Sequence, residues 1–304
     1  MPDPTPDVFL NGAFVSRHDA RVSAFDAAFQ HGVGLFETMS ARIDPEGVPH
    51  IARLEAHLER LITSAMELGL VERLRAQPLA DAALETVRKA GHTDARVRLT
   101  LTGGDLNMLE QGGGPQHDPT LLIVSQPATR YPEALFERGG AAVIADAKAN
   151  PLDPTAGHKT LNYWWRLREL QRAARAGAAE AIVLQVSNHL AGGTVSNLFV
   201  VKNDTLFTPI ARGEEENVGG QNAIPSPVLP GTTREAVIEL AESKRLGCAR
   251  KMLDVNDLLD ADEVFLTNSS WGVLPIVKIE KEAIADAVPG PITRDLRAAL
   301  LGSE

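Results

Sequence analysis

The chain has 304 residues, of which 44% are hydrophobic and 23% are charged, a composition typical of globular proteins. Its formal net charge is −10, whereas a surface that binds nucleic acid must be basic, so no nucleic-acid partner is expected. Cys248 is the single cysteine, which excludes an intramolecular disulfide and a thiolate metal cluster; we interpret it as a packing residue.

The amino-terminal residues contain neither the basic region nor the apolar stretch of a signal peptide. No apolar run in the sequence is long enough to cross a bilayer. We therefore expect a cytoplasmic protein with no membrane partner, and the length favours two domains.

The first part of the chain predicts a small α+β domain of antiparallel character over residues 1–126. Asn11-Gly12, a pair typical of a tight turn, lies between two short apolar segments and predicts a hairpin over 8–15. Further strands are expected at 34–41, 95–102 and 121–124, with a flexible loop at 112–115. Apolar residues at helical spacing predict helices over 51–68 and 79–90.

Residues 127–137 have the composition of an interdomain linker, and a larger mixed α/β domain is expected over 138–304. Its predicted strands are 141–144, 181–184, 198–201, 206–207 and 263–266. Its predicted helices run from just after Lys159 to about residue 176, from 233 to 243 and from 292 to 300.

Lys159 lies between a loop rich in turn residues, 150–157, and a predicted helix. Most lysines simply solvate a surface, and this is the favoured interpretation of Lys159 taken alone. A lysine held in a partly desolvated cleft can instead attack a carbonyl as a neutral amine. Such a lysine can carry an aldehyde cofactor as a Schiff base.

Other segments contain residue types that suit an anion. The run from Pro230 to Arg234 precedes a predicted helix, and its backbone N–H groups and hydroxyls suit a phosphate, although Thr232 or Thr233 could equally cap the helix. Arg60 could clamp a phosphate or form an ordinary ion pair, and nearby His57 could be a satisfied, half-buried histidine. The residues 268–270 follow a strand, where they suit an anion or a simple turn.

Taken together, these segments resemble the class IV aminotransferases, which are the fold-type IV pyridoxal-phosphate enzymes. That family includes branched-chain aminotransferases, D-amino-acid aminotransferases and aminodeoxychorismate lyases. The resemblance covers nearly the whole chain and rests on residues 9–12, 31–38, 57–61, 158–163, 193–199, 229–234, 265–269 and 290–293.

The resemblance implies a two-domain α+β fold, pyridoxal 5'-phosphate as cofactor and a homodimer. It implies that Lys159 forms the Schiff base with the cofactor and moves the α-proton of the substrate. It assigns the cofactor phosphate to Arg60, Thr232, Thr233 and Ser269. It assigns the phenolic oxygen of the cofactor to Tyr163, which falls one residue closer to the lysine than in the branched-chain enzymes.

The same resemblance assigns the substrate pocket to His31, Phe36, Arg98 and Ser270. Either His31 or Arg98 could meet a substrate carboxylate, and Arg98 could equally be structural. No metal site is expected, because His50 and His57 have no companion ligand set. A nicotinamide dehydrogenase is not expected, because its Gly-rich fingerprint is absent.

The chain departs from the family at Gly192. The family usually has a glutamate here, whose carboxylate bonds the protonated pyridine nitrogen of the cofactor. Such a charge-assisted hydrogen bond is worth roughly 1.5–3 kcal/mol, so its loss would slow catalysis by about one to two powers of ten. Either the nitrogen is less protonated in this protein, or another carboxylate replaces the missing one; the acidic loop 214–216 is one conceivable donor.

The sequence therefore predicts an aminotransferase that moves an amino group between an amino acid and a 2-oxo acid. The alternative is aminodeoxychorismate lyase, because Lys159 and Asn162 have the Lys-x-x-Asn spacing common in that branch. A second alternative, kept open by Gly192, is a cofactor-binding protein with little catalytic activity. Neither the identity nor the chirality of the substrate follows from the sequence.

Overall fold

A computed structural model of the chain describes residues 7–105, 119–216 and 224–303. Contacts between Cα atoms divide the chain into two compact units. The first unit extends to Thr129 and also includes His158–Asn162, whereas the second contains Arg130–Gly157 and the chain from Tyr163 onward. The domain limits expected from the sequence stay a prediction, and the loop predicted at 112–115 lies outside the described residues.

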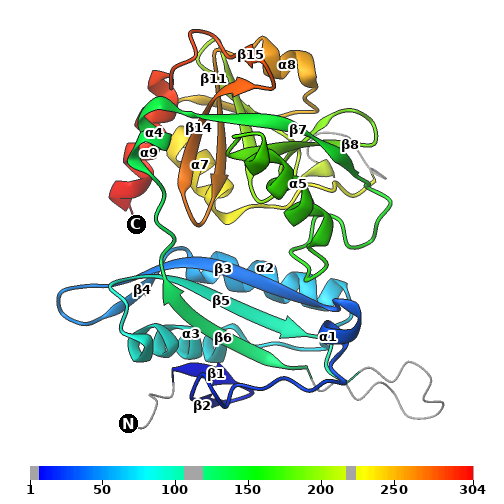
Figure 1. Ribbon diagram of the computed structural model, residues 1–304, viewed down its shortest axis with the longest axis vertical. Coiled ribbons are helices and arrows are strands. Elements are labelled where there is room, and N and C mark those ends of the chain that lie inside the picture. The colour runs from blue at the N-terminus through cyan, green and yellow to red at the C-terminus, as the bar shows by residue number, and fades with distance from the viewer. Residues whose placement is uncertain (1–6, 106–118, 217–223, 304) are drawn as a thin grey trace. The chain divides into compact units, whose positions relative to one another are not determined.

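The first unit contains a six-stranded antiparallel sheet of order β2-β1-β6-β5-β3-β4 (Figure 1). Its strands are β1 (Val8–Leu10), β2 (Ala13–Val15), β3 (Gly34–Ile43), β4 (Pro49–Ile51), β5 (Asp94–Thr102) and β6 (Leu121–Pro127). The hairpin β1–β2 forms at Asn11-Gly12, as predicted, since both residues adopt positive φ. Ile51, which was predicted to begin a helix, belongs instead to β4 and pairs with Ala41.

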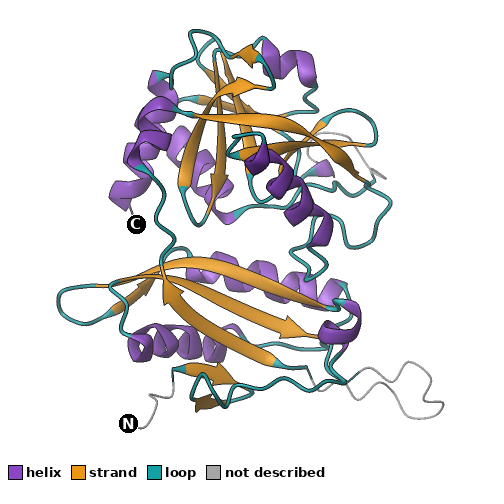
Figure 2. Cartoon of the chain, viewed as in Figure 1, coloured by secondary structure: helices purple, strands orange, loops and turns teal. Residues whose placement is uncertain are grey.

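Two amphipathic helices, α2 (Leu54–Glu67) and α3 (Ala76–Ala90), lie along this sheet (Figure 2). On β5, Val97, Leu99 and Leu101 are buried against them, while Arg96 and Arg98, on either side of Val97, are exposed. This alternation follows from the period of two in a strand, which places successive side chains on opposite faces. The sheet therefore has one apolar face under the helices and one face that carries polar and aromatic side chains.

The second unit contains a nine-stranded mixed sheet of order β12-β11-β10-β13-β14-β7-β8-β9, with β15 paired to β14. Its strands are β7 (Gly140–Ala149), β8 (Glu180–Gln185), β9 (Leu190–Gly193), β10 (Asn197–Lys202), β11 (Thr205–Thr208), β12 (Gly247–Arg250), β13 (Glu263–Asn268), β14 (Gly272–Ile279) and β15 (Glu282–Ala283). Leu198 and Phe199 of β10 belong to different apolar clusters, because both faces of this sheet are buried.

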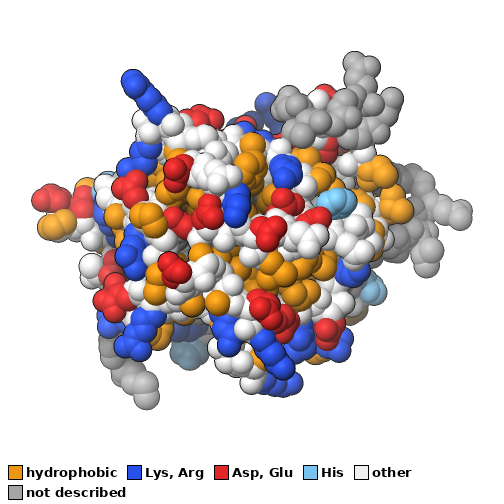
Figure 3. Space-filling view, turned by 90° about the horizontal axis from the view of Figure 1, so that it is seen from above, with side chains coloured by type: hydrophobic (Ala, Val, Ile, Leu, Met, Phe, Trp, Pro, Cys, Tyr) orange, Lys and Arg blue, Asp and Glu red, His pale blue; other side chains and the backbone are white. Residues whose placement is uncertain are grey.

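The helices of the second unit are α4 (Glu133–Arg138), α5 (Trp164–Arg175), α7 (Thr232–Ser243), α8 (Val255–Leu259) and α9 (Pro291–Ser303). α7 and α9 pack on one face of the sheet, where Val237 and Leu296 contact the cluster of Phe199 and Phe265. None of the helices in the described ranges is long and apolar enough to cross a membrane. On the face seen in Figure 3, acidic and basic side chains are interspersed.

The strand β14 was not predicted, although it lies in the middle of the second sheet between β13 and β7. Its run of apolar residues contains Pro275, and proline disfavours a central strand because it has no N–H for the ladder. Pairing on both sides overrides this local signal, and the register of β14 against β7 shifts just beyond the proline, between Ile276 and Lys278.

Candidate active site

The segment that carries Lys159 is held against the edge of β3 in the first unit. The Phe36 N–H donates to the Lys159 carbonyl at 3.0 Å, and the Leu161 N–H donates to the Gly34 carbonyl at 2.9 Å. This edge is open to the segment because β4 pairs only with the other end of β3, at Ala41–Ile43. Backbone pairing therefore fixes the position from which the Lys159 side chain starts.

His158 anchors the same segment to α2. Its side chain is buried, with Nδ1 3.0 Å from the Ser64 hydroxyl and Nε2 3.5 Å from the Glu67 carboxylate. Lys159 itself is half-buried, and its Nζ lies 4.6 Å from the centre of the Phe36 ring. The sequence motif at residues 158–163 did not by itself predict this anchoring role of His158.

Two cations lie over the same aromatic ring in the first unit. The guanidinium carbon of Arg98 is 3.8 Å from the centre of the Phe36 ring, next to the 4.6 Å contact made by Lys159. Thr38, the cross-strand partner of Arg98, follows Phe36 by two residues on β3, so Arg98 and Phe36 share the face of the sheet opposite the helices. The structure thus brings together Lys159, Phe36 and Arg98, three of the predicted site residues.

Arg60 forms a buried network with two residues that sequence analysis did not connect to it. Its Nε and Nη2 donate to Glu37 Oε1 and Oε2 at 2.9 and 2.5 Å, and His57 Nδ1 lies 2.7 Å from Glu37 Oε2. Arg60 comes from α2 and Glu37 from β3, where it takes a core-facing position beside Leu35 and Met39. The sequence did contain one signal for this network: Glu37 is the single acidic residue in the run of β3. A buried carboxylate is almost always paired, so a partner could have been expected.

The charges of this network oppose the cost of burial. Burial alone would raise the pKa of Glu37, but the charge of Arg60 and the hydrogen bonds from His57 and Arg60 lower it to about 2. Burial lowers the pKa of His57, and the charges of Arg60 and Lys159 act in the same direction, against the hydrogen bond to Glu37. Glu37 is therefore the carboxylate that neutralises Arg60, while His57 is neutral at pH 7.

His31 is the last residue of α1 (Ala27–His31) and is exposed. The helix starts at Asp26, whose buried carboxylate accepts from the Ala28 N–H at 2.8 Å and from the hydroxyls of Thr102 and Thr120 at 2.7 and 2.8 Å. The structure thus places His31 at the end of a helix that is fixed to the sheet at its other end.

In the second unit, Thr232 and Thr233 form the buried first turn of α7. The N-cap residue is Gly231, which has no side chain to accept from the helix, so the alternative that Thr232 caps the helix is wrong. The Thr233 hydroxyl lies 3.4 Å from that of Ser269, and Ser270 donates its N–H to Asn268 Oδ1 at 2.9 Å. A twelve-residue helix whose buried start has no side-chain cap suits an anion.

A buried hydroxyl beside this turn supports the same conclusion. Thr267 Oγ1 is buried and has no hydrogen-bond partner among the described residues. Thr267 pairs with Asn197 across the sheet, so the two side chains lie on the same face. Asn197 in turn contacts the approach to α7, because its Nδ2 donates to the Leu229 carbonyl at 2.8 Å.

Glycine is required at position 231 because Asn197 approaches it closely: a Cβ there would lie 1.9 Å from Asn197 Oδ1. Gly231→Ala is therefore expected to displace the turn and lower the free energy of unfolding by about 1–3 kcal/mol, measured by denaturant titration. Gly302→Ala, where a Cβ meets nothing within 4 Å, is the control and should change stability little. Equal effects of the two substitutions would contradict the expected clash.

Gly192, the position of the missing glutamate, lies in β9 with φ +148°, and a Cβ there would be 2.8 Å from the Ser196 carbonyl oxygen. The loop after it is held by Glu180, a buried carboxylate that sequence analysis missed. Glu180 accepts from the N–H groups of Ala181 and Val195 at 2.9 and 3.1 Å, from the Ser196 hydroxyl at 3.0 Å and from the Thr194 hydroxyl. Both carboxylate oxygens are thus engaged, and burial raises the pKa of Glu180 despite these bonds.

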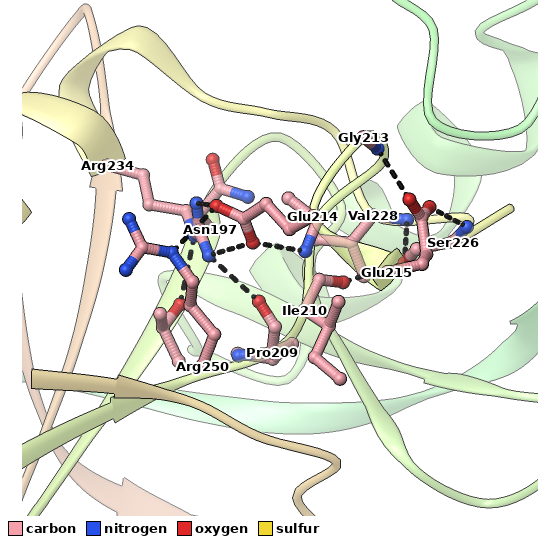
Figure 4. Close-up of polar contacts among 12 residues, drawn as sticks. Asn197, Pro209, Ile210, Gly213, Glu214, Glu215, Ser226, Val228, Arg234 and Arg250 are labelled. Carbon is pink, nitrogen blue, oxygen red and sulfur yellow. Dashed lines mark hydrogen bonds and ion pairs between the residues drawn. The ribbon is translucent and has the colours of Figure 1, made fainter. Parts of the chain in front are cut away.

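Two of the three glutamates in the acidic loop 214–216 are bonded to other groups of the second unit. Glu214 pairs with Arg234 and Arg250, and Glu215 accepts from the N–H groups of Gly213 and Ser226 (Figure 4).

Tyr163 immediately precedes α5, and its hydroxyl lies 3.5 Å from the Thr194 carbonyl oxygen. Arg166 donates to the same carbonyl at 3.1 Å and was not predicted as part of the site.

Comparison with known proteins agrees with this architecture. The sequence profile of the amino-transferase class IV family matches residues 34–279. A Methanocaldococcus jannaschii protein provisionally named as a branched-chain-amino-acid aminotransferase is 32% identical over 293 residues, which cover 95% of this chain and 93% of that protein. A D-alanine aminotransferase from Bacillus licheniformis is 27% identical and covers 97% of this chain and 96% of its own.

Solved structures show the same fold. The branched-chain amino acid aminotransferase of Escherichia coli has a TM-score of 0.85 at 26% identity, with 97% of this chain and 93% of that chain covered. The 4-amino-4-deoxychorismate lyase of Pseudomonas aeruginosa has a TM-score of 0.80 at 26% identity, covering 97% and 98%. The chain belongs to the class IV aminotransferases, a family of pyridoxal-phosphate enzymes, as predicted.

Proposed function

We propose that Lys159 is the catalytic lysine of this aminotransferase and binds the aldehyde of pyridoxal 5'-phosphate. The observation that carries the proposal is the attachment of the Lys159 segment to β3, which holds a half-buried amine beside Phe36. When bound, the cofactor withdraws electrons from the α-carbon of the amino acid. Lys159 would hold the cofactor before reaction and then carry the α-proton through its neutral amine.

Two sets of residues fit the phosphate of this cofactor. Arg60 offers a guanidinium whose plane is fixed by Glu37. The first turn of α7, with the hydroxyls of Thr233, Thr267 and Ser269, offers backbone and side-chain donors. Tyr163 is proposed to contact the phenolic oxygen, and no carboxylate at position 192 is available for the ring nitrogen, because the residue is glycine.

The test of this assignment is chemical. Purified protein with bound cofactor is reduced with borohydride, and the labelled peptide is identified by mass spectrometry. The label is expected on Lys159, and its recovery on another lysine would refute the assignment.

We further propose that one substrate of the pair is a dicarboxylic acid of the 2-oxoglutarate and glutamate class. Arg98 is exposed and lies over the Phe36 ring that Lys159 also contacts, so its guanidinium can receive a second carboxylate at the end of a short side chain. The names of the relatives suggest a neutral aliphatic amino acid as the other substrate. They do not agree on chirality, so a panel of both L- and D-amino acids is needed.

Arg98→Ala is expected to raise the KM for 2-oxoglutarate by about 10²-fold while leaving the KM for a monocarboxylic 2-oxo acid nearly unchanged, because a charge-assisted bidentate bond is lost only with the diacid. Steady-state kinetics with both acceptors measure this difference. Arg96→Ala is the matched control, since Arg96 lies two residues away on the same face of β5 and bonds Gln126. An equal rise in both KM values would contradict a role of Arg98 in binding the second carboxylate of the diacid.

The lyase remains the alternative, favoured by the solved lyase structure and by the spacing from Lys159 to Asn162. Release of pyruvate from an aminodeoxychorismate substrate without any amino acceptor would establish it. An amino-acid-dependent half-reaction without pyruvate release supports the transaminase.

The homodimer and the cytoplasmic location stay predictions. Large exposed apolar side chains support a second copy of the chain as partner, because removing apolar surface from water is favourable. They are Phe25 and Phe29 in the first unit, which are 69% and 77% exposed, and Trp164 and Leu167 on α5 in the second, which are 79% and 46% exposed.

A further inference from the structure

The connection between β11 and α7 begins with a polar network that ends on the first turn of α7 (Figure 4). Arg234, the third residue of α7, is buried with 1% of its surface exposed. Its Nη1 and Nη2 donate to the two carboxylate oxygens of Glu214, both at 2.8 Å. Its Nε donates to the Thr208 hydroxyl at 3.1 Å, and Nη2 also donates to the Pro209 carbonyl at 3.1 Å.

Glu214 serves a second arginine and the backbone of its own loop. Arg250 Nε donates to Glu214 Oε1 at 3.0 Å, and the Ala211 N–H donates to Oε2 at 2.8 Å. Burial alone would raise the pKa of Glu214, but the hydrogen bonds and charge of Arg234, with further help from Ala211 and Arg250, bring it below its ordinary value. One ionised carboxylate thus lies between two guanidinium groups.

The pairing of Glu214 with Arg234 affects the position of the first turn of α7. A buried guanidinium that loses its carboxylate partner is strongly unfavourable, so the position of Arg234 depends on Glu214. Arg234 directly follows Thr232 and Thr233, and a helical turn cannot shift one of these residues without the others. On the other side, Asn197 holds the residues before the helix through its hydrogen bond to the Leu229 carbonyl, and its Oδ1 leaves no room for a Cβ at Gly231.

We propose that Glu214 is a positioning residue for phosphate recognition: through Arg234 it sets the place of the backbone N–H groups and hydroxyls at the start of α7. This inference rests on the proposed role of that turn in binding the cofactor phosphate. Glu214 does not touch the cofactor in this proposal; it acts through Arg234.

Whether Glu214→Gln strengthens or weakens phosphate binding separates a positioning role from a direct effect of charge. Glu214→Gln removes a negative charge, which by simple Coulomb attraction would strengthen the binding of a phosphate nearby. A positioning role predicts the opposite, namely that Glu214→Gln binds the phosphate more weakly. A purely structural role predicts a lower melting temperature with no selective loss of phosphate recognition.

The experiment compares pyridoxal 5'-phosphate with pyridoxal, which has the aldehyde but no phosphate, by absorbance titration of the cofactor-free full chain. Glu214→Gln is expected to raise the Kd for pyridoxal 5'-phosphate by about tenfold and to change the Kd for pyridoxal less than about twofold. Glu215→Gln is the matched control, because Glu215 lies in the same loop but bonds only backbone N–H groups in the described network. Glu214→Asp, which keeps the charge on a shorter side chain, is the second variant in case Glu214→Gln does not fold. It should raise the Kd for pyridoxal 5'-phosphate by less than the roughly tenfold change expected for Glu214→Gln.

The outcomes are distinguishable. Wild-type protein that binds both compounds equally would overturn the phosphate role of α7 and the inference with it. A wild-type preference for the phosphate that Glu214→Gln and Glu214→Asp leave unchanged, or strengthen, would overturn the inference alone. Equal weakening for both compounds would reduce Glu214 to a structural residue.

Discussion

Lys159→Ala is expected to lower the aminotransferase rate by about 10³-fold or more, because one substitution removes both the amine that we propose holds the cofactor and the base that we propose moves the α-proton. The backbone of this segment is bonded to β3 through Lys159 O and Leu161 N, which do not depend on the side chain. The variant should therefore fold normally. Half-reaction rates with an amino acid donor, measured by absorbance, provide the test.

Lys89→Ala is the matched control for this substitution. Lys89 Nζ lies 4.9 Å from the centre of the Phe14 ring, so it is also a lysine stacked on a phenylalanine in the first unit. Its removal should leave the transamination rate within about twofold of wild type, as for most surface changes. A Lys159→Ala variant that retains wild-type rate would remove Lys159 from the reaction, and the lysine found by borohydride labelling would replace it.

Glu37→Gln is expected to lower the free energy of unfolding by about 3–5 kcal/mol at pH 7, because it leaves the Arg60 guanidinium without its buried counter-charge. Glu37 and His57 are fully buried, so water cannot replace the lost interaction. The same change frees the orientation of the Arg60 side chain, and under the proposed role of Arg60 the affinity for the cofactor phosphate should fall with it. Denaturant unfolding measures the first effect.

The pH dependence of stability gives an independent check on Glu37. Its pKa in the folded protein, about 2, lies below its ordinary value of 4.5, so the carboxylate stabilises the fold above pH 4.5. This contribution is lost as the pH falls from 4.5 to 2, and at about 1.4 kcal/mol for each pH unit it amounts to about 3 kcal/mol. Glu37→Gln should remove this part of the acid sensitivity.

Asp26→Asn is the control for the buried carboxylate. Among the described residues, the Asp26 carboxylate accepts only from the neutral donors of Ala28, Thr102 and Thr120, so its replacement leaves none of their buried cations uncompensated. We expect a smaller loss of stability, about 1–3 kcal/mol. If Asp26→Asn and Glu37→Gln lower the free energy of unfolding equally, the loss of the counter-charge of Arg60 does not explain the effect of Glu37→Gln.

Much of the fold was predictable because its elements have strong local patterns. The alternation along β5 and the helical spacing of α2 and α3 were read correctly from single segments. The strands that were missed have short or interrupted patterns, as in β4, β9 and β14 with its Pro275. Such strands form because neighbouring strands pair with them, and pairing is not a local property.

The candidate site shows the same division. Lys159, Arg60 and the Thr232-Thr233 turn stood out because they lie in segments that resemble the class IV aminotransferases, although each has an ordinary structural interpretation when taken alone. Their supporting residues did not, because Glu37 lies 23 positions before Arg60 and Glu214 lies 20 positions before Arg234. A buried ion pair between distant segments leaves no periodic signal in the sequence.

By itself, then, the sequence determined the family and the cofactor class, since these depend on short motifs in a particular order, and it predicted which residues would touch the cofactor. Only the tertiary structure decided which carboxylates hold those residues in place: Glu37 for Arg60, Glu180 for the loop after Gly192, and Glu214 for the start of α7. The physical reason is that burial forces each charged or polar group to find a partner, and the partner is chosen by proximity in the folded chain.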